Sequence, residues 1–285
     1  MRWQWLVSAC ISLVGLTMPG AVIVYSNNTP LGDSFTNPSA TNQGQAIGTS
    51  GWYYNNVRNG ATVGIAGALP YASNGSVYFQ SPSGLAKADV EYLANAVNIG
   101  GNYFAAGSLG LFSDLLWFSY SWYRDSASTN PAVQHPVLRV LLDADGNLST
   151  LGDRGGLVFE RAYNGGIVPA DTWVFDVIGP STYLWNFGLG LGFAANINAT
   201  PSPYDATLAE WQAYFPNAVI LGFSSGVGSG WNGQFNGAVD EIAWLLGGVI
   251  TETNFETGPL AEIPEPSALM LTAAGLAVVC RRRRT

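Results

Sequence analysis

The stretch Leu116-Trp-Phe-Ser-Tyr-Ser-Trp-Tyr123 carries large apolar side chains at alternating and at neighbouring positions. Successive side chains along a β-strand point to opposite faces of its sheet. A strand with large rings on both faces is stable only where both faces are covered. The stretch therefore predicts a central strand that is buried on each side.

The rest of the sequence has the composition of an all-β protein. Glycine occurs 35 times, and aromatic residues make up 13% and charged residues 11% of the 285 residues. Alternating or β-branched runs are separated by clusters of Gly, Pro, Asn, Asp and Ser, as expected for short strands joined by turns. This pattern predicts a two-sheet β-sandwich of the jelly-roll type. The predicted strands cover residues 22–25, 75–80, 89–93, 115–124, 137–143, 156–160, 172–177, 183–187, 219–224 and 237–246.

One short surface helix is predicted at residues 207–215, where apolar residues recur at helical spacing before Pro216. No repeat of 20 to 50 residues is present in the sequence, which argues against a propeller or a solenoid. We expect the β-sandwich domain to span residues 22–251 and a linker to follow over residues 252–263.

The two ends of the chain have the patterns of targeting segments. Residues 1–21 contain one basic residue, a 12-residue apolar core and small residues after it, which predicts a secretory signal peptide. Near the other end, an apolar stretch over residues 267–280 predicts a separate helix of about 21 Å, shorter than a hydrocarbon core of about 30 Å. Terminal arginines would extend its reach and remain on the cytoplasmic side, so the body would lie outside. The tail also contains Pro264, Glu265, Pro266, Arg281, Arg282, Arg283 and Arg284.

This tail resembles the sorting signal of the PEP-CTERM family, which consists of exported bacterial proteins handled by an exosortase. The resemblance covers residues 263–285 and implies that Pro264, Glu265 and Pro266 form the recognition and processing region. The two prolines keep this segment extended and outside the membrane helix. The resemblance implies an exosortase-like enzyme and the bacterial inner membrane as partners, with transient anchoring before delivery to the cell surface or the extracellular polysaccharide. A plain C-terminal membrane anchor is the alternative.

Charge and cysteine content restrict the partners of the body. Both cysteines, Cys10 and Cys280, lie in the targeting segments, so the body has neither a disulfide framework nor a thiolate metal site. Without Arg2, the four terminal arginines and Glu265, the body holds 6 basic and 18 acidic residues, a net charge of −12. This charge argues against nucleic acid as a partner and suits divalent cations.

Residues 141–154 are rich in side-chain oxygens, which are the ligands that Ca²⁺ prefers. The spacing is not that of an EF-hand, because glycine falls at the fourth position of the loop and Arg154 replaces the bidentate Glu. A β-hairpin with an Asp-Gly turn explains the same residues without an ion. The sequence leaves both a structural calcium and a hairpin without metal open. The candidate ligands are Asp143, Asp145, Asn147 and Asp153.

A glycine-rich loop leads into Val239-Asp-Glu-Ile242, which is similar to the last strand of concanavalin-like and carbohydrate-binding jelly rolls. In some of those proteins an Asp of the final strand helps to hold a structural calcium, so the resemblance implies Asp240 as a further candidate ligand. An edge strand with Asp240 at the surface is the alternative.

The tryptophans of the body are candidate glycan contacts, because flat rings can stack on the faces of sugars. Trp231 is flanked by a glycine-rich loop and is expected to be exposed, and Trp185 is the second candidate. Most other tryptophans of the body lie within strand or helix patterns, where core packing explains them.

We expect no enzyme and no catalytic residue. His135 is the only histidine in the sequence, and no Gly-x-Ser-x-Gly elbow stands at a strand-to-helix turn.

The sequence favours an exported, exosortase-processed protein with a structural or adhesive sandwich. A carbohydrate-binding module and a jelly-roll glycoside hydrolase are the alternatives. An aromatic platform beside a groove would favour the module, and two carboxylates that face each other across a cleft would favour the hydrolase.

Overall fold

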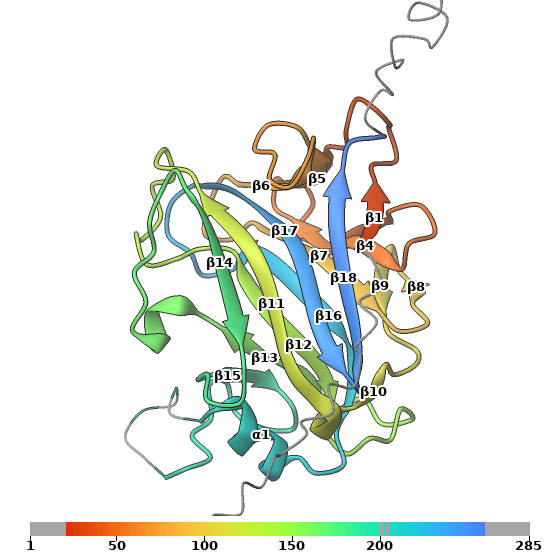
Figure 1. Cartoon of the computed structure of the whole chain (residues 1–285), viewed down its shortest axis with the longest axis vertical. Helices are drawn as coiled ribbons and strands as arrows, with labels where there is room; N and C mark the ends of the chain where they lie inside the picture. The colour runs from red at the N-terminus through yellow and green to blue at the C-terminus, as the bar shows by residue number, and fades with distance from the viewer. Residues whose placement is uncertain (1–20, 200–201, 203, 205, 260–285) are drawn as a thin grey trace, which may run out of the picture.

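A computed structural model describes residues 21–199, 202, 204 and 206–259, which form two packed β-sheets with one α-helix within these residues (Figure 1). The predicted jelly-roll β-sandwich with a short helix is therefore confirmed. The expected signal peptide, except for Ala21, the expected apolar helix at 267–280 and the Pro264–Pro266 motif lie outside the described residues. Among the residues that the structure describes, none of the helices has the length and the hydropathy of a membrane span.

Sheet A contains eight strands. They are β1 (Val22–Tyr25), β2 (Phe35–Asn37), β5 (Ala61–Ala66), β6 (Ser76–Ser81), β11 (Leu115–Arg124), β14 (Trp173–Ile178), β17 (Phe235–Leu246) and β18 (Val249–Glu256). Their order is β1-β18-β17-β6-β5-β2, with β11 beside β17 and β14 beside β11. The β1–β18 pair is parallel, whereas the other pairs of this sheet are antiparallel.

Sheet B packs against sheet A and also contains eight strands. They are β3 (Gln43–Ala46), β4 (Trp52–Arg58), β7 (Lys87–Leu93), β10 (Gly110–Leu111), β12 (Val137–Asp143), β13 (Arg154–Phe159), β15 (Trp185–Gly188) and β16 (Val219–Gly228). Their order is β15-β13-β12-β16-β7-β4-β3, with β10 beside β16. A separate ribbon joins β8 (Val97–Ile99) and β9 (Asn102–Phe104), and two short 3₁₀ helices are η1 (Phe112–Asp114) and η2 (Arg161–Asn164).

The aromatic stretch forms β11, which lies between β14 and β17 as a central strand of sheet A. Phe118, Tyr120 and Trp122 are fully buried and belong to the hydrophobic core. Trp117 and Tyr123 lie on the other face and are only partly buried. The strand is therefore central within its sheet. The sequence predicts burial on both faces, but the outer face of the strand is only partly covered.

Aromatic rings join the two sheets in the interior. Phe223 of β16 stacks on Trp244 of β17 with ring centroids 4.3 Å apart, and it also contacts Phe118 of β11 at 5.9 Å. Trp52 of β4 meets Phe255 of β18 edge-on at 5.0 Å. Because each of these contacts crosses from one sheet to the other, the core fixes how the two layers lie against each other.

The predicted helix is α1 (Leu208–Tyr214), which begins with a capping box. The Thr207 hydroxyl accepts from the backbone N–H of Glu210, and the Glu210 carboxylate accepts from the backbone N–H of Thr207. Leu208 and Trp211 are buried, and the Trp211 indole N–H donates to the Leu184 carbonyl at 3.0 Å. The helix thus attaches to the sandwich through one apolar face.

The end of the domain differs from the expected boundary. Strand β18 runs to Glu256, so it includes five residues of the predicted 252–263 linker. It pairs with β17 on one side and β1 on the other, and Phe255 is fully buried. This segment is mostly polar, and its pairing with β17 and β1 shows that it belongs to the sheet.

Candidate functional site

The outer face of sheet B carries a cluster of charged residues. On β7, Ala88 and Val90 belong to the core, so the alternation of a strand places Asp89 and Glu91 on the opposite face. On β12, Val140 faces the core in the same way, and Arg139 lies on the outer face.

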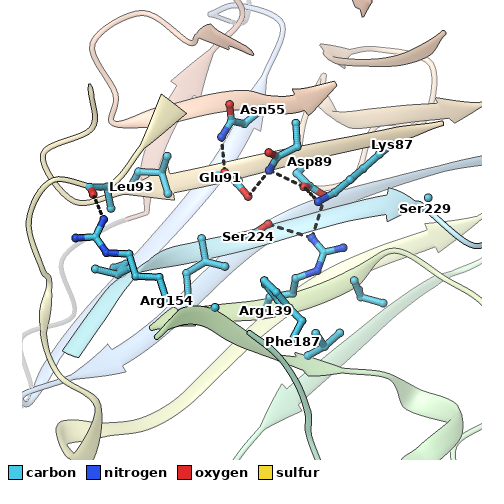
Figure 2. Close-up of a pocket in the computed structure, with 18 of the residues that line it drawn as sticks. Asn55, Lys87, Asp89, Glu91, Leu93, Arg139, Arg154, Phe187, Ser224 and Ser229 are labelled. Carbon is cyan, nitrogen blue, oxygen red and sulfur yellow. Dashed lines mark hydrogen bonds and ion pairs between the residues drawn. The ribbon is translucent and has the colours of Figure 1, made fainter. Parts of the chain in front are cut away.

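A groove of about 460 Å³ lies over this face (Figure 2). It is bordered by strands β4, β7, β12, β13, β15 and β16 and by β9. Its charged lining residues are Lys87, Asp89, Glu91, Arg139, Arg154 and Glu160, and its aromatic ones are Tyr103, Phe104, Trp185, Phe187, Phe193 and Trp231. The volume is within the range of about 300–1,000 Å³ that is usual for small-ligand sites.

Asp89 is the centre of the polar floor. Its carboxylate pairs with Lys87 at 3.0 Å and with Arg139 at 2.9 Å, and the side chain is almost fully buried. Burial raises the pKa of Asp89, but the charges of Lys87 and Arg139 outweigh it, so this pKa lies below its usual value. Gly226 makes room for the carboxylate, because a Cβ at this position would lie 2.0 Å from Asp89 Oδ1.

Two asparagines of β4 hold the second carboxylate. Asn55 Nδ2 donates to Glu91 Oε2 at 2.6 Å, and Asn56 Nδ2 donates both to Glu91 Oε1 at 3.1 Å and to Asp89 Oδ2 at 2.9 Å (Figure 2). Asn56 has a φ of 54°, in the left-handed region that Asn tolerates, at an irregularity in the pairing of β4 with β7. Burial and the charge of Asp89 raise the pKa of Glu91.

The structure brings the two candidate tryptophans to the same groove. Trp185 of β15 donates its indole N–H to Glu160 at 3.1 Å and contacts Phe193, which is 74% exposed. Trp231 is partly buried, not exposed as expected, because its ring packs edge-on against the buried Phe235 at 5.2 Å. The charged floor of this groove was not predicted from the sequence. Its one local signal was Asp89-x-Glu91, two carboxylates on the polar face of an alternating strand, whereas the partners on β4 and β12 depend on the strand order.

His135 has a structural environment. Its ring is buried, stacks on Trp122 at 4.4 Å and accepts from the backbone N–H of Arg161 through Nε2. Burial lowers the pKa of His135 to about 4, so the ring is neutral at pH 7. This histidine supports the core and does not line the groove.

Three of the predicted calcium ligands lie together. Asp143, Asp145 and Asp153 each offer an oxygen within 4.8 Å of the others. Asn147 lies in the same loop, where its backbone N–H donates to Asp145, and its Oδ1 accepts from the Ser149 hydroxyl at 2.6 Å and from the Ser149 backbone N–H at 3.2 Å. Asp240 belongs to β17 in the other sheet and is not among these clustered carboxylates.

Asp240 is buried, not at the surface, and its carboxylate accepts hydrogen bonds where the strand pairing of sheet A is irregular. Strand β17 changes its neighbour here from β6 to β18, and Glu241 takes a left-handed φ of 46° at a bulge opposite β11. Asp240 Oδ1 accepts from the backbone N–H groups of Phe255 at 3.0 Å and Glu241 at 2.8 Å. The carboxylate therefore replaces backbone acceptors that the bulge removes.

The pKa of Asp240 predicts a pH dependence of stability. Burial raises this pKa to about 7 in the folded state, above the value of 3.8 that an accessible Asp has. Between about pH 4 and 7 the folded protein holds a proton that the unfolded chain releases, so this group makes stability fall as pH rises through that window. Asp240→Asn should flatten this slope and raise the free energy of unfolding at pH 8 by up to about 4 kcal/mol.

Urea denaturation of both proteins at pH 5 and pH 8 measures this effect. The contribution of His135 has the opposite sign and is present in both proteins, so their difference isolates Asp240. An equal change between the two pH values in wild type and variant would contradict the assignment.

The comparisons with known proteins concern the tail and the fold. The PEP-CTERM protein-sorting motif matches residues 262–284, which confirms the resemblance drawn from the sequence. Two solved structures are similar to this chain. One is the family 11 carbohydrate-binding module from Clostridium thermocellum in complex with a beta-1,3-1,4-mixed-linked tetrasaccharide; it has 10% sequence identity and a TM-score of 0.36, and the match covers 75% of this chain and 96% of the module. The other is the family 11 module of a cellulosomal cellulase of Clostridium thermocellum; it has 9% sequence identity and a TM-score of 0.33, and the match covers 79% of this chain and 89% of that module. No curated protein matches the sequence. The chain thus carries a PEP-CTERM sorting motif, which indicates export.

Proposed function

We propose that this chain is an exported protein whose β-sandwich binds a neutral polysaccharide at the cell surface or in the extracellular matrix. Residues 264–285 hold it transiently at the inner membrane until an exosortase-like enzyme processes Pro264-Glu265-Pro266. The sorting motif at residues 262–284 and the signal-peptide pattern at residues 1–21 support the route. Binding of the polysaccharide by the sandwich would give the exported protein an adhesive role.

The groove on sheet B is the observation that carries the binding proposal. Trp185 and Trp231 come from segments far apart in the sequence and line the same groove, and Phe193 adds an exposed ring beside Trp185. Hydrogen-bonding groups of Asn55, Asn56 and Ser224 line the groove as well. Apolar walls with a few placed polar groups suit a sugar, which presents both a flat apolar face and hydroxyl groups.

The charges around the groove favour a neutral ligand. The groove is lined by three basic and three acidic side chains, and Asp89 is already paired with Lys87 and Arg139. The body as a whole has a net charge of −12 and would repel an acidic polymer. A neutral glycan needs no unpaired charge in the site.

Two of the three carboxylates that line the groove favour binding without hydrolysis. Asp89 and Glu91 lie on one face of one strand, and they are 0% and 5% exposed. A glycosidase needs two carboxyl groups on either side of the scissile bond, about 5–10 Å apart. Two buried neighbours on β7 cannot flank a sugar bond between them, so these residues support the floor instead.

Substitution of the two tryptophans tests the binding proposal. We expect the wild-type protein to be retarded in native gels that contain neutral β-glucans, xylans or mannans. Trp231→Ala and Trp185→Ala should each lower the affinity at least about tenfold, which corresponds to about 1.4 kcal/mol of lost contact.

Trp173→Ala is the matched control, because Trp173 is a partly buried tryptophan on β14 that packs on Tyr71 and Tyr123 and does not line the groove. It should keep wild-type retardation, and a melting curve for each variant separates lost binding from lost folding. If wild type shows no retardation with any of these polymers, or if all three variants bind equally, the groove is not a glycan site.

Deletion of residues 265–285 tests the route independently. The truncated protein should be released or misplaced without any change in the melting temperature of the sandwich, because the described domain ends before this segment. Cell fractionation with mass determination of the mature chain measures both location and processing. A truncated protein that still reaches the same surface location would contradict the sorting role.

A further inference from the structure

Three carboxylates converge in the hairpin between β12 and β13. Asp143 is the last residue of β12 and lies opposite Arg154, the first residue of β13. Asp145 and Asp153 belong to the loop that joins these strands. Each of the three Asp side chains offers an oxygen within 4.8 Å of the oxygens of the other two.

One of these oxygens is buried without a partner. Asp143 is 0% exposed, and its Oδ2 accepts from Arg154 Nε at 3.2 Å, whereas its Oδ1 has no hydrogen-bond partner. A buried carboxylate oxygen that lacks a donor is unfavourable, and such atoms are rare in folded proteins. A cation near Asp143 would give this oxygen a partner.

The charges in the loop indicate how much positive charge is needed. Arg154 is the one basic side chain that forms an ion pair with any of the three carboxylates in the part of the chain that the structure describes. Three carboxylates and one guanidinium leave a charge of −2. A divalent cation would neutralise it.

Hydrogen bonds within the loop orient the other two carboxylates. Asp145 Oδ1 accepts from the Asn147 backbone N–H at 2.7 Å, and Asp153 Oδ2 accepts from the Asp145 backbone N–H at 3.0 Å. Their remaining oxygens lie 3.5 and 3.3 Å from the Thr150 hydroxyl, which is closer to the Asn147 carbonyl, at 2.8 Å. The single proton of Thr150 cannot satisfy all of these acceptors.

We propose that Asp143, Asp145 and Asp153 bind a calcium ion at this end of sheet B. Calcium holds oxygens at about 2.3–2.6 Å, so two of its ligands can be up to about 5.2 Å apart, and the three Asp oxygens lie within 4.8 Å of one another. Calcium also accepts a flexible set of oxygen ligands, whereas magnesium demands near-ideal octahedral geometry. Asp145 is exposed, so water can complete the six to eight oxygen ligands of calcium.

The ion would stabilise the hairpin end and, through it, one wall of the groove. Arg154 lines the groove and donates to the carbonyls of Ala105 at 3.1 Å and Leu148 at 2.8 Å while its Nε contacts Asp143. Calcium on the other oxygen of Asp143 would hold this arrangement without displacing the arginine. The inference uses none of the polysaccharide contacts and stands independently of that proposal.

Calorimetric titration of the chelator-treated full chain with CaCl₂ tests the site. We expect one ion per chain with a dissociation constant of about 10⁻⁴ M, as in extracellular calcium modules. The melting temperature should rise by about 5 °C or more when calcium reaches about 100 times that constant. Asp145→Asn, at an exposed position, should weaken binding at least tenfold without unfolding the protein, and Asp153→Asn should do the same.

Asp171→Asn is the control, since Asp171 is an exposed loop Asp outside the cluster, and it should bind calcium as wild type does. Asp143→Asn is unsuitable as the main test, because it removes the partner of Arg154 from a buried position. The proposal is overturned if wild type shows neither binding heat nor a shift in melting temperature. It is also overturned if Asp145→Asn binds like wild type, or if MgCl₂ binds as tightly as CaCl₂.

Discussion

The packing of Phe223 between the two sheets is the contact on which the rest of the structure depends. Its ring stacks on Trp244 and touches Phe118, and these two residues are register partners on neighbouring strands of sheet A. All three are at most 4% exposed. Removing rings of this size from water contributes about 1.5–3 kcal/mol each, and their shapes fix the spacing and rotation of the layers.

The groove follows from the same packing, because it lies on the reverse side of the strands that build the core. Phe223 points inward and its neighbour Ser224 outward, and Arg139 alternates with the buried Val140 in the same way. The inter-sheet contacts therefore set the positions of the strands that carry the polar floor. The three carboxylates at the end of the β12–β13 hairpin lie at the edge of this face, and Arg154 contacts both regions.

Features with a local signal could be predicted from the sequence, and features that depend on strand register could not. The strand β11, the capped helix α1 and the Asp-rich turn each follow from a few consecutive residues. The floor at Asp89 required knowledge that β7 lies between β4 and β16, which brings two asparagines and Arg139 to it. The burial of Asp240 likewise depends on a bulge and a change of neighbouring strand. Several other strands have only two to four residues and are too short to show periodicity in the sequence.

The nuclear magnetic resonance signals of the tryptophan indole N–H groups test the central claim most directly, namely that the groove on sheet B holds a sugar chain. Titration with a neutral oligosaccharide should shift the signals of Trp185 and Trp231, which line the groove. The signals of Trp173 and of the buried Trp122 should stay in place. Shifts at Trp173 with none at Trp185 and Trp231 would place the ligand elsewhere and contradict the account.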